Sequence, residues 1–273
     1  MTSRPLRSSL GWSTPSEIYV YGRDLPGELL GTIDFGGMTY LALTGAMPTP
    51  PQARMFNTLL VTLVEHGQTP SSIATRMTFL GAPESLQAAV AAGLLGLGSV
   101  FVGSIGTAAE MLSEAVAESS AETSGTEVTE RVVERFLSTR VPLPGIGHPK
   151  HKPIDPRTPR LFDIARETEQ FGAACQMMHA IQATAEAKKG RALPINATGA
   201  IAAIAVDLGL TPLQAQGLGI IARSAGLVAH AMEEMREPIA REIWERIDGE
   251  VTQGQLAQRA EANGGVRKEG VGS

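Results

Sequence analysis

Fourteen residues from Pro144 to Arg157 hold the strongest concentration of side chains that could do chemistry. The segment reads PGIGHPKHKPIDPR, with two histidines, two lysines and an arginine. Glycines and prolines disfavour a regular helix here, so we expect a shaped loop. Lysine binds phosphate as a point charge, arginine offers a planar fork to a carboxylate, and histidine can exchange a proton. The loop favours an anionic ligand; a solvated basic loop between two helices is the alternative.

The pattern within this loop resembles a known active-site signature. Gly145, Gly147 and His148 are followed by Asp155-Pro156-Arg157, with the arginine nine residues after the histidine. This arrangement resembles that of citrate synthases and of the lyase module of ATP-citrate lyase. Weaker matches to the same family follow in order at residues 21–25, 40–45, 65–67 and 222–230. The short length and residues 188–196 look closer to stand-alone citryl-CoA lyases than to full-length synthases.

The resemblance implies a role for several side chains in binding a polycarboxylate. His148 would lie at the hydroxyl or carbonyl oxygen of the substrate, and Arg157 and Arg223 would each clamp a carboxylate in bidentate fashion. His66 would be a further substrate contact. Arg241 would reach into the site of a neighbouring subunit, which implies a homodimer with a shared active site.

The resemblance also implies coenzyme A, as an acyl-CoA substrate or product. Lys152 matches a basic position that meets the phosphates of coenzyme A in related enzymes, and the loop from Gly145 to Gly147 would lie against the adenine. No metal is expected, because no pair of histidines shares a helix face at i, i+4 with an acidic partner.

Two positions depart from the family pattern. Phe101 stands where synthases have a catalytic histidine, and the lyase module of ATP-citrate lyase also has a phenylalanine at this point. The change weakens condensation by the synthase route but leaves carbon-carbon cleavage open. Thr198, in Asn196-Ala197-Thr198-Gly199, replaces the catalytic aspartate of the family. A threonine hydroxyl can donate or accept a hydrogen bond but cannot act as a base near neutral pH.

These residues lead to one function and two alternatives. The leading hypothesis is a citryl-CoA lyase-like carbon-carbon lyase, which cleaves citryl-CoA or a related 3-hydroxyacyl-CoA by a retro-aldol step to acetyl-CoA and oxaloacetate. In one alternative the chain binds acyl-CoA or a polycarboxylate without turnover, because Thr198 has replaced the aspartate. In the other it acts on a different CoA ester, and His151 or a substrate carboxylate supplies the base.

Two further histidines and one acidic run are interpreted as part of the helical framework and not of a reaction site. His179 and His230 lie in apolar stretches and are interpreted as helix-packing residues. The acidic run Glu233-Glu234 with Arg236-Glu237 is interpreted as a solvated helix face.

Helices are the elements that must position these residues. Apolar residues recur every three or four positions in the segments 55–64, 105–116, 128–137 and 161–181. Helix starts are predicted where a capping threonine precedes a proline with Glu or Gln three positions after the threonine, at Thr14, Thr49 and Thr211. We therefore predict an all-α fold.

The family resemblance further implies a citrate synthase-like architecture of two domains. Residues 1–105 and 199–273 would form a large helical domain, and residues 106–198 a smaller inserted helical domain, with the ligand in the cleft between them. The polar stretch 118–125 is expected to be a surface loop, and the glycine-rich tail from about Gly254 is expected to be disordered at its end.

Composition excludes several classes of protein. A net charge of −5 argues against a general nucleic-acid binder, because neutralising phosphates needs a basic face. Cys175 is the single cysteine, so no internal disulfide can form, which favours the cytoplasm. We find no run of 18 apolar residues and no apolar signal-peptide core, so we expect a soluble protein without a membrane span.

Overall fold

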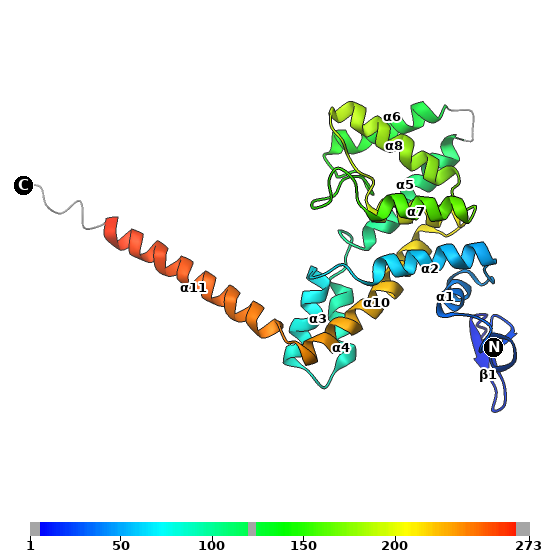
Figure 1. Cartoon of the computed structure of the whole chain (residues 1–273), viewed down its shortest axis with the longest axis horizontal. Coiled ribbons are helices and arrows are strands. Elements are labelled where there is room, and N and C mark those ends of the chain that lie inside the picture. The colour runs from blue at the N-terminus through cyan, green and yellow to red at the C-terminus, as the bar shows by residue number, and fades with distance from the viewer. Residues whose placement is uncertain (1–5, 120–123, 266–273) are drawn as a thin grey trace, which may run out of the picture. The chain divides into compact units, whose positions relative to one another are not determined.

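The computed structural model describes residues 6–119 and 124–265, and most of them are helical (Figure 1). The predicted all-α class is confirmed. In chain order the α-helices of the described residues are α1 (Phe35–Thr44), α2 (Pro50–Val64), α3 (Pro70–Gly81), α4 (Leu86–Leu95), α5 (Gly103–Ser119), α6 (Gly125–Thr139), α7 (Arg157–Glu167), α8 (Ala173–Lys189), α9 (Ala197–Asp207), α10 (Pro212–Arg236) and α11 (Ala240–Gly265).

A small antiparallel sheet precedes the helices. Its three strands lie in the order β1 (Gly11–Ser13), β2 (Ile18–Val20) and β3 (Arg23–Asp24), and a short π-helical turn, η1 (Leu25–Leu29), follows. The helix start predicted at Thr14 is therefore wrong. Thr14 Oγ1 does accept the backbone N–H of Glu17 at 3.0 Å, but the backbone N–H of Thr14 also donates to Glu17 O at 2.9 Å, which closes a hairpin turn. The β-branched and aromatic residues that follow then pair as a strand.

The other two predicted helix starts are confirmed. At α2 the backbone N–H of Thr49 donates to Gln52 Oε1 at 2.9 Å, and that of Gln52 donates to Thr49 Oγ1 at 3.5 Å. The same reciprocal pair joins Thr211 and Gln214 at the start of α10, at 2.8 and 3.3 Å. Each box satisfies backbone donors that the first turn of a helix leaves unpaired.

The chain divides into two compact units. One contains the described residues of 1–65 and 97–224, and in it α5, α7 and α8 pack against α9, while α6 packs against α5 and α8. Helix α9 is apolar on all sides and buried, since every residue from Ala200 to Ala205 is without solvent exposure. The apolar segment 161–181 is divided between two helices, α7 and α8. Asp207 accepts the N–H groups of Gly172, Ala174 and Cys175, and these bonds stabilise the start of α8.

The other unit contains the described residues of 66–96 and 225–273. Helices α3 and α4 pack closely, and a Cβ atom at Gly93 would come within 2.1 Å of Thr75 Oγ1, so this crossing requires glycine. Leu227 and Ala231 of α10 are fully buried, and α11 packs against α3.

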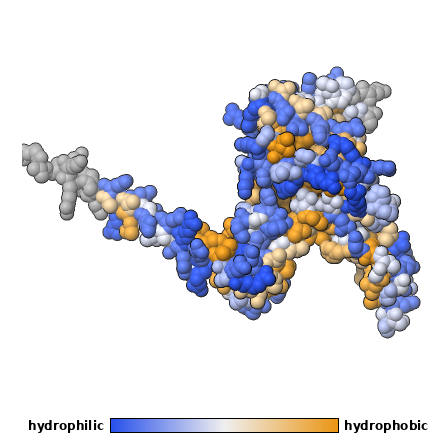
Figure 2. Space-filling view, viewed as in Figure 1, coloured by the Kyte–Doolittle hydropathy of each residue, from blue (hydrophilic) through white to orange (hydrophobic). Residues whose placement is uncertain are grey.

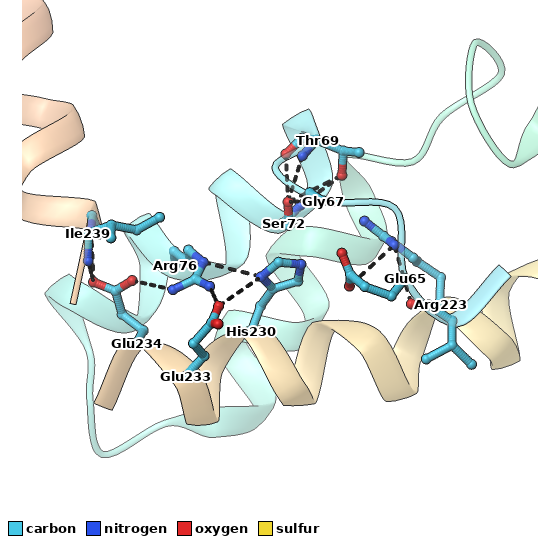
Figure 3. Close-up of polar contacts among 12 residues, drawn as sticks. Glu65, Gly67, Thr69, Ser72, Arg76, Arg223, His230, Glu233, Glu234 and Ile239 are labelled. Carbon is cyan, nitrogen blue, oxygen red and sulfur yellow. Dashed lines mark hydrogen bonds and ion pairs between the residues drawn. The ribbon is translucent and has the colours of Figure 1, made fainter. Parts of the chain in front are cut away.

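A buried ionic cluster fixes α3, α10 and α11 within this second unit (Figure 3). The side chain of Arg76 is 1% exposed; its Nη1 donates to Glu234 Oε2 at 2.8 Å, its Nε donates to His230 Nδ1 at 3.2 Å, and its Nη2 pairs with Glu233. Glu234 Oε1 also accepts the N–H groups of Ile239 and Ala240, where α11 begins. His230 is buried, as predicted, but a solvated face is wrong for Glu234, which is 5% exposed.

The two segments expected to lack regular structure, 118–125 and the C-terminal tail, are only partly among the described residues. The polar stretch 118–125 does connect two helices, although residues 120–123 lie outside the described residues. The tail is helical as far as Gly265, and the disorder expected at its end concerns residues 266–273, which lie outside the described residues. Within the described part of the chain, no helix has both the length and the apolar character of a membrane span. The predicted domain division at residues 105 and 198 stays a prediction.

Candidate active site

The loop from Pro144 to Arg157 is attached to the segment that leads into α9. The backbone N–H of Gly147 donates to Pro194 O at 2.7 Å, and that of Asn196 donates to Gly145 O at 3.0 Å. Gly145 has a φ of +78°, and a Cβ atom there would lie 2.6 Å from the Cα of Gly199. Gly147 has a φ of +89°. Both glycines are therefore required by the backbone conformation, and Gly145 also by its close approach to α9.

His148 is oriented by the backbone of its own loop. Its Nδ1 accepts the N–H groups of Lys150 at 3.1 Å and His151 at 2.8 Å. Since Nδ1 is an acceptor, the neutral ring carries its proton on Nε2 and can donate there to an oxygen. The ring of His151 lies beside that of His148, with centroids 4.3 Å apart.

Asn196 joins this loop to Thr198. It caps α9 by accepting the N–H of Gly199 at its Oδ1, at 3.0 Å, and its Nδ2 donates to Gly147 O at 2.7 Å. The same Oδ1 accepts the hydroxyl proton of Thr198 at 2.7 Å. The Thr198 oxygen is thus left with lone pairs only, so it can accept a hydrogen bond from a ligand but cannot remove a proton as a carboxylate would.

Arg157 begins α7, and its guanidinium is held by Asp155. Its Nε and Nη2 donate to the two oxygens of this carboxylate at 3.0 and 2.8 Å, so of five N–H donors three remain for a ligand. Asp155 is fully buried and also accepts the N–H of Ala197. Burial raises the pKa of Asp155, but the hydrogen bonds and charge of Arg157, with the N–H of Ala197, lower it from 3.8 to about 2.

A basic cavity of about 420 Å³ opens beside His148. Two of its lining residues, Lys152 and Arg191, are cations, and most of the other lining residues are apolar. This combination suits an anionic group attached to an apolar body. The cavity is lined by Gly147, His148, Lys152, Pro153, Arg191, Ala192, Leu193 and Pro194.

Arg223 lies on α10 against the end of α2 in the same unit (Figure 3). It is 4% exposed, its Nη1 donates to Val64 O at 3.3 Å, and Glu65 Oε2 lies 3.7 Å away. Burial lowers the pKa of Arg223, and the charge of Glu65 partly opposes this. A buried guanidinium can bind an anion through charge-assisted hydrogen bonds.

Comparison with known proteins identifies the family. The family described as "Citrate synthase, C-terminal domain" matches residues 30–244. The chain belongs to the citrate synthase family. Among solved structures, citryl-CoA lyase from Hydrogenobacter thermophilus has 37% identity and a TM-score of 0.77, over 86% of this chain and 88% of that one. The predicted citrate synthase-like fold is thereby confirmed.

More distant relatives of the citrate synthase family are larger than this chain. ATP citrate lyase from Methanothrix soehngenii, in complex with citrate and coenzyme A, has 21% identity and a TM-score of 0.71, over 86% of this chain and 40% of its own. It therefore supports the fold alone. ATP-citrate synthase beta chain protein 1 of Arabidopsis thaliana is 27% identical over an alignment of 201 residues, which covers 67% of this chain. The chain spans about a third of that relative, 32% of its length.

The predicted site residues fall into two groups. Those that meet at the loop and the start of α9 are Gly145, Gly147, His148, Lys152, Arg157 and Thr198. Arg223 belongs to the same unit, and His66 and Arg241 belong to the other unit, so their roles at the site stay predictions. His66 is exposed just beyond α2, and Arg241, on α11, pairs with Glu245 at 3.8 Å.

Two residues that shape the site were given no role in the sequence analysis. Arg191 lines the basic cavity, and its sequence signal was only its place in the basic run 188–191. Asp155 orients Arg157, and its signal was its place two residues before that arginine. Phe101, in the turn before α5, is 44% exposed.

Proposed function

We propose that this chain is a carbon-carbon lyase of the citryl-CoA lyase type. The observation that carries the proposal is the 37% identity to a citryl-CoA lyase over nearly the whole of both chains. The basic cavity beside His148 supports it, because Lys152 and Arg191 could pair with the phosphates of a CoA ester while the substrate lies at the histidine. Coenzyme A is thus the proposed ligand of this cavity.

The proposed reaction is a retro-aldol cleavage that balances without a further reactant. The hydroxyl of citryl-CoA loses its proton, the adjacent carbon-carbon bond breaks, and oxaloacetate leaves with a new carbonyl. The electron pair of the broken bond forms the enolate of the thioester, and one proton added to its carbon gives acetyl-CoA. Developing negative charge is stabilised best by donors that are already in position.

The side chains of the loop match these steps. His148, with its proton on Nε2, donates to the oxygen that becomes the carbonyl of oxaloacetate. The three remaining N–H donors of Arg157 bind a substrate carboxylate. Thr198 accepts a hydrogen bond and takes no proton, so His151 or a substrate carboxylate acts as the base.

The same threonine favours a second candidate, a protein that binds a CoA ester without turnover. The hydroxyl proton of Thr198 is held by Asn196, and a missing general base reduces a rate by roughly 10²–10⁴-fold. Saturable binding of acetyl-CoA with no release of oxaloacetate from citryl-CoA would favour this candidate.

A homodimer is also proposed, in which Arg241 of one copy reaches the site of the other. Helix α11 supports it, because Trp244, Ile247 and Val251 are spaced by three and four residues and are each at least half exposed. Figure 2 shows hydrophobic residues where α11 begins. Light scattering after size exclusion tests this: a dimer mass is expected, and a monomer that cleaves citryl-CoA would contradict the shared site.

The lyase proposal is tested by oxaloacetate release from citryl-CoA. The Arg157→Ala variant removes a carboxylate clamp, and we expect its kcat/KM to fall at least about tenfold. Arg160→Ala is the matched control, since Arg160 lies on the same helix and pairs only at the surface with Glu167. Equal activities of the two variants would count against the assigned site.

A further inference from the structure

One wall of the basic cavity is the 191–194 segment, which directly follows α8. Four of the residues that line the cavity belong to it, namely Arg191, Ala192, Leu193 and Pro194. Gly190 ends α8 with a left-handed φ of +62°, and the chain turns there. The way in which the 191–194 segment is held against α8 therefore decides where the guanidinium of Arg191 lies.

Two side chains of α8 hold both backbone polar groups of Leu193. The N–H of Leu193 donates to Glu186 Oε1 at 2.8 Å, and its carbonyl oxygen accepts from Gln182 Nε2 at 3.0 Å. Gln182 Nε2 also donates to Glu186 Oε1 at 3.4 Å, so the two side chains support each other. Positions i and i+4 lie on one face of a helix, so this pair presents a donor and an acceptor together, as the edge of a β-strand does.

The residues after Leu193 have anchors that do not involve α8. Pro194 O accepts the N–H of Gly147 at 2.7 Å, and Ile195 O accepts the hydroxyl of Thr158 at 3.0 Å. Both Pro194 and Ile195 are buried. Loss of the contacts at Leu193 should therefore displace Arg191 more than the loop that carries His148.

Arg191 depends on the contacts at Leu193 because it has no such anchors. Within the described residues, neither Arg191 nor Ala192 makes a backbone hydrogen bond, and both are exposed. They connect two fixed points, Gly190 at the end of α8 and Leu193. A short connection with both ends fixed has few conformations, so less entropy is lost when Arg191 is ordered by a ligand.

The charge of Glu186 by itself works against an anionic ligand. Glu186 does not line the basic cavity, but a single hydrogen bond joins it to Leu193, which does. Like charges repel, so a carboxylate in this position disfavours phosphate in the cavity. Its bonds to Leu193 supply a structural role that offsets this repulsion.

We propose that Glu186 and Gln182 are positioning residues, which hold Leu193 so that Arg191 meets an anionic group of the ligand in the basic cavity. Neither side chain lines this cavity, so both act through Leu193. The inference rests on the proposed function, in which the cavity takes the phosphates of a CoA ester.

Acetyl-CoA is the probe, titrated into the purified protein by calorimetry. Glu186→Leu removes the acceptor for the N–H of Leu193, and Gln182→Met removes the donor to its oxygen; each should raise Kd about three- to tenfold. Glu186→Gln keeps an acceptor oxygen and loses only the charge, so its Kd should equal that of the parent or fall below it. Gln176→Met, an exposed change on the same helix, is the matched control and should leave Kd unaltered.

Charge and position predict opposite results for Glu186→Leu. Removal of a negative charge alone would lower Kd for an anion, whereas loss of the bond to Leu193 raises it. A double-mutant cycle with Arg191→Ala tests whether the effect passes through Arg191. Arg191→Ala should raise Kd less in the Glu186→Leu protein than in the parent, because the guanidinium has already lost its position there.

Thermal unfolding establishes that each variant is folded. An unchanged or lower Kd for folded Glu186→Leu and Gln182→Met overturns the proposal, as do equal effects of Arg191→Ala in the two backgrounds. These results leave the lyase proposal intact, since the parent protein still binds acetyl-CoA. A parent protein that binds no acetyl-CoA would instead overturn the proposed function, and this inference with it.

Discussion

The hydroxyl of Thr198 donates its proton to Asn196 Oδ1 over 2.7 Å. Through the same amide group, Asn196 caps α9 and holds the carbonyl of Gly147, the residue before His148. Thr198, which we expect to stand in the place of the family aspartate, is thus part of the bonding that shapes the histidine loop. Substitutions can separate the effect of Thr198 on the rate of cleavage from its effect on the shape of this loop.

Thr198→Asp places a carboxylate at the position that we align with the family aspartate. We expect citryl-CoA cleavage to rise at least about tenfold, because a positioned general base contributes roughly 10²–10⁴-fold. The rate of oxaloacetate release at neutral pH is the measurement, with Thr107→Asp, an exposed change on α5, as control. No change in rate for a folded Thr198→Asp protein would contradict the alignment of Thr198 with the aspartate.

Asn196→Asp and Asn196→Ala separate the loop contact from the helix cap. Aspartate keeps an oxygen to cap α9 but loses the donor to Gly147 O, so it should weaken acetyl-CoA binding with little loss of stability. Alanine loses both, and should also lower the free energy of unfolding by about 1 kcal/mol. Calorimetry and urea unfolding measure the two effects. Equal acetyl-CoA affinities of Asn196→Asp and the parent protein would contradict the proposal that the contact between Asn196 and Gly147 shapes the binding loop.

Asp155 should make stability depend on pH in the acid range. Its pKa is lowered from 3.8 to about 2 in the folded state, so its contribution is full above about pH 4 and is lost as pH falls through about 2. The shift corresponds to about 2 kcal/mol. Urea unfolding of the parent protein and Asp155→Asn from pH 5 down to about 2 should show their difference in unfolding free energy shrinking. A constant difference would contradict this account.

Glu234 should contribute strongly to the stability of the second unit. In Glu234→Gln the buried Arg76 loses a charged partner and α11 loses part of its cap, so we expect a loss of about 3 kcal/mol in unfolding free energy. Glu237→Gln, an exposed change on the same acidic segment, should alter stability by less than about 0.5 kcal/mol. Urea unfolding compares them. Similar small losses in both variants would show that the cluster is not stabilising.

Local signals in the sequence predicted the helices well. The boxes at Thr49 and Thr211 were correct because each is followed by a long apolar period of about 3.6 residues. The box at Thr14 has the same polar groups but precedes Ile18, Tyr19 and Val20, whose side chains favour pairing with β1. The pattern that follows the cap decides between helix and hairpin.

Contacts between distant parts of the sequence could not be predicted in the same way. Glu234 looked solvated because its neighbours in sequence are charged, yet Arg76, 158 residues away, pairs with it in the core. Arg191 reaches the basic cavity only because the segment before α9 bonds to the loop at Gly147. The sequence contained the residues of the site but not the pairing that brings them together.

Citryl-CoA cleavage by the purified protein, compared with His148→Ala, tests the central claim most directly. The account predicts release of oxaloacetate and acetyl-CoA in equal amounts, with kcat reduced roughly 10²-fold or more in the variant because the donor to the developing oxyanion is lost. Cleavage at the same rate in folded His148→Ala, or no cleavage by the parent protein while it binds acetyl-CoA, would contradict it.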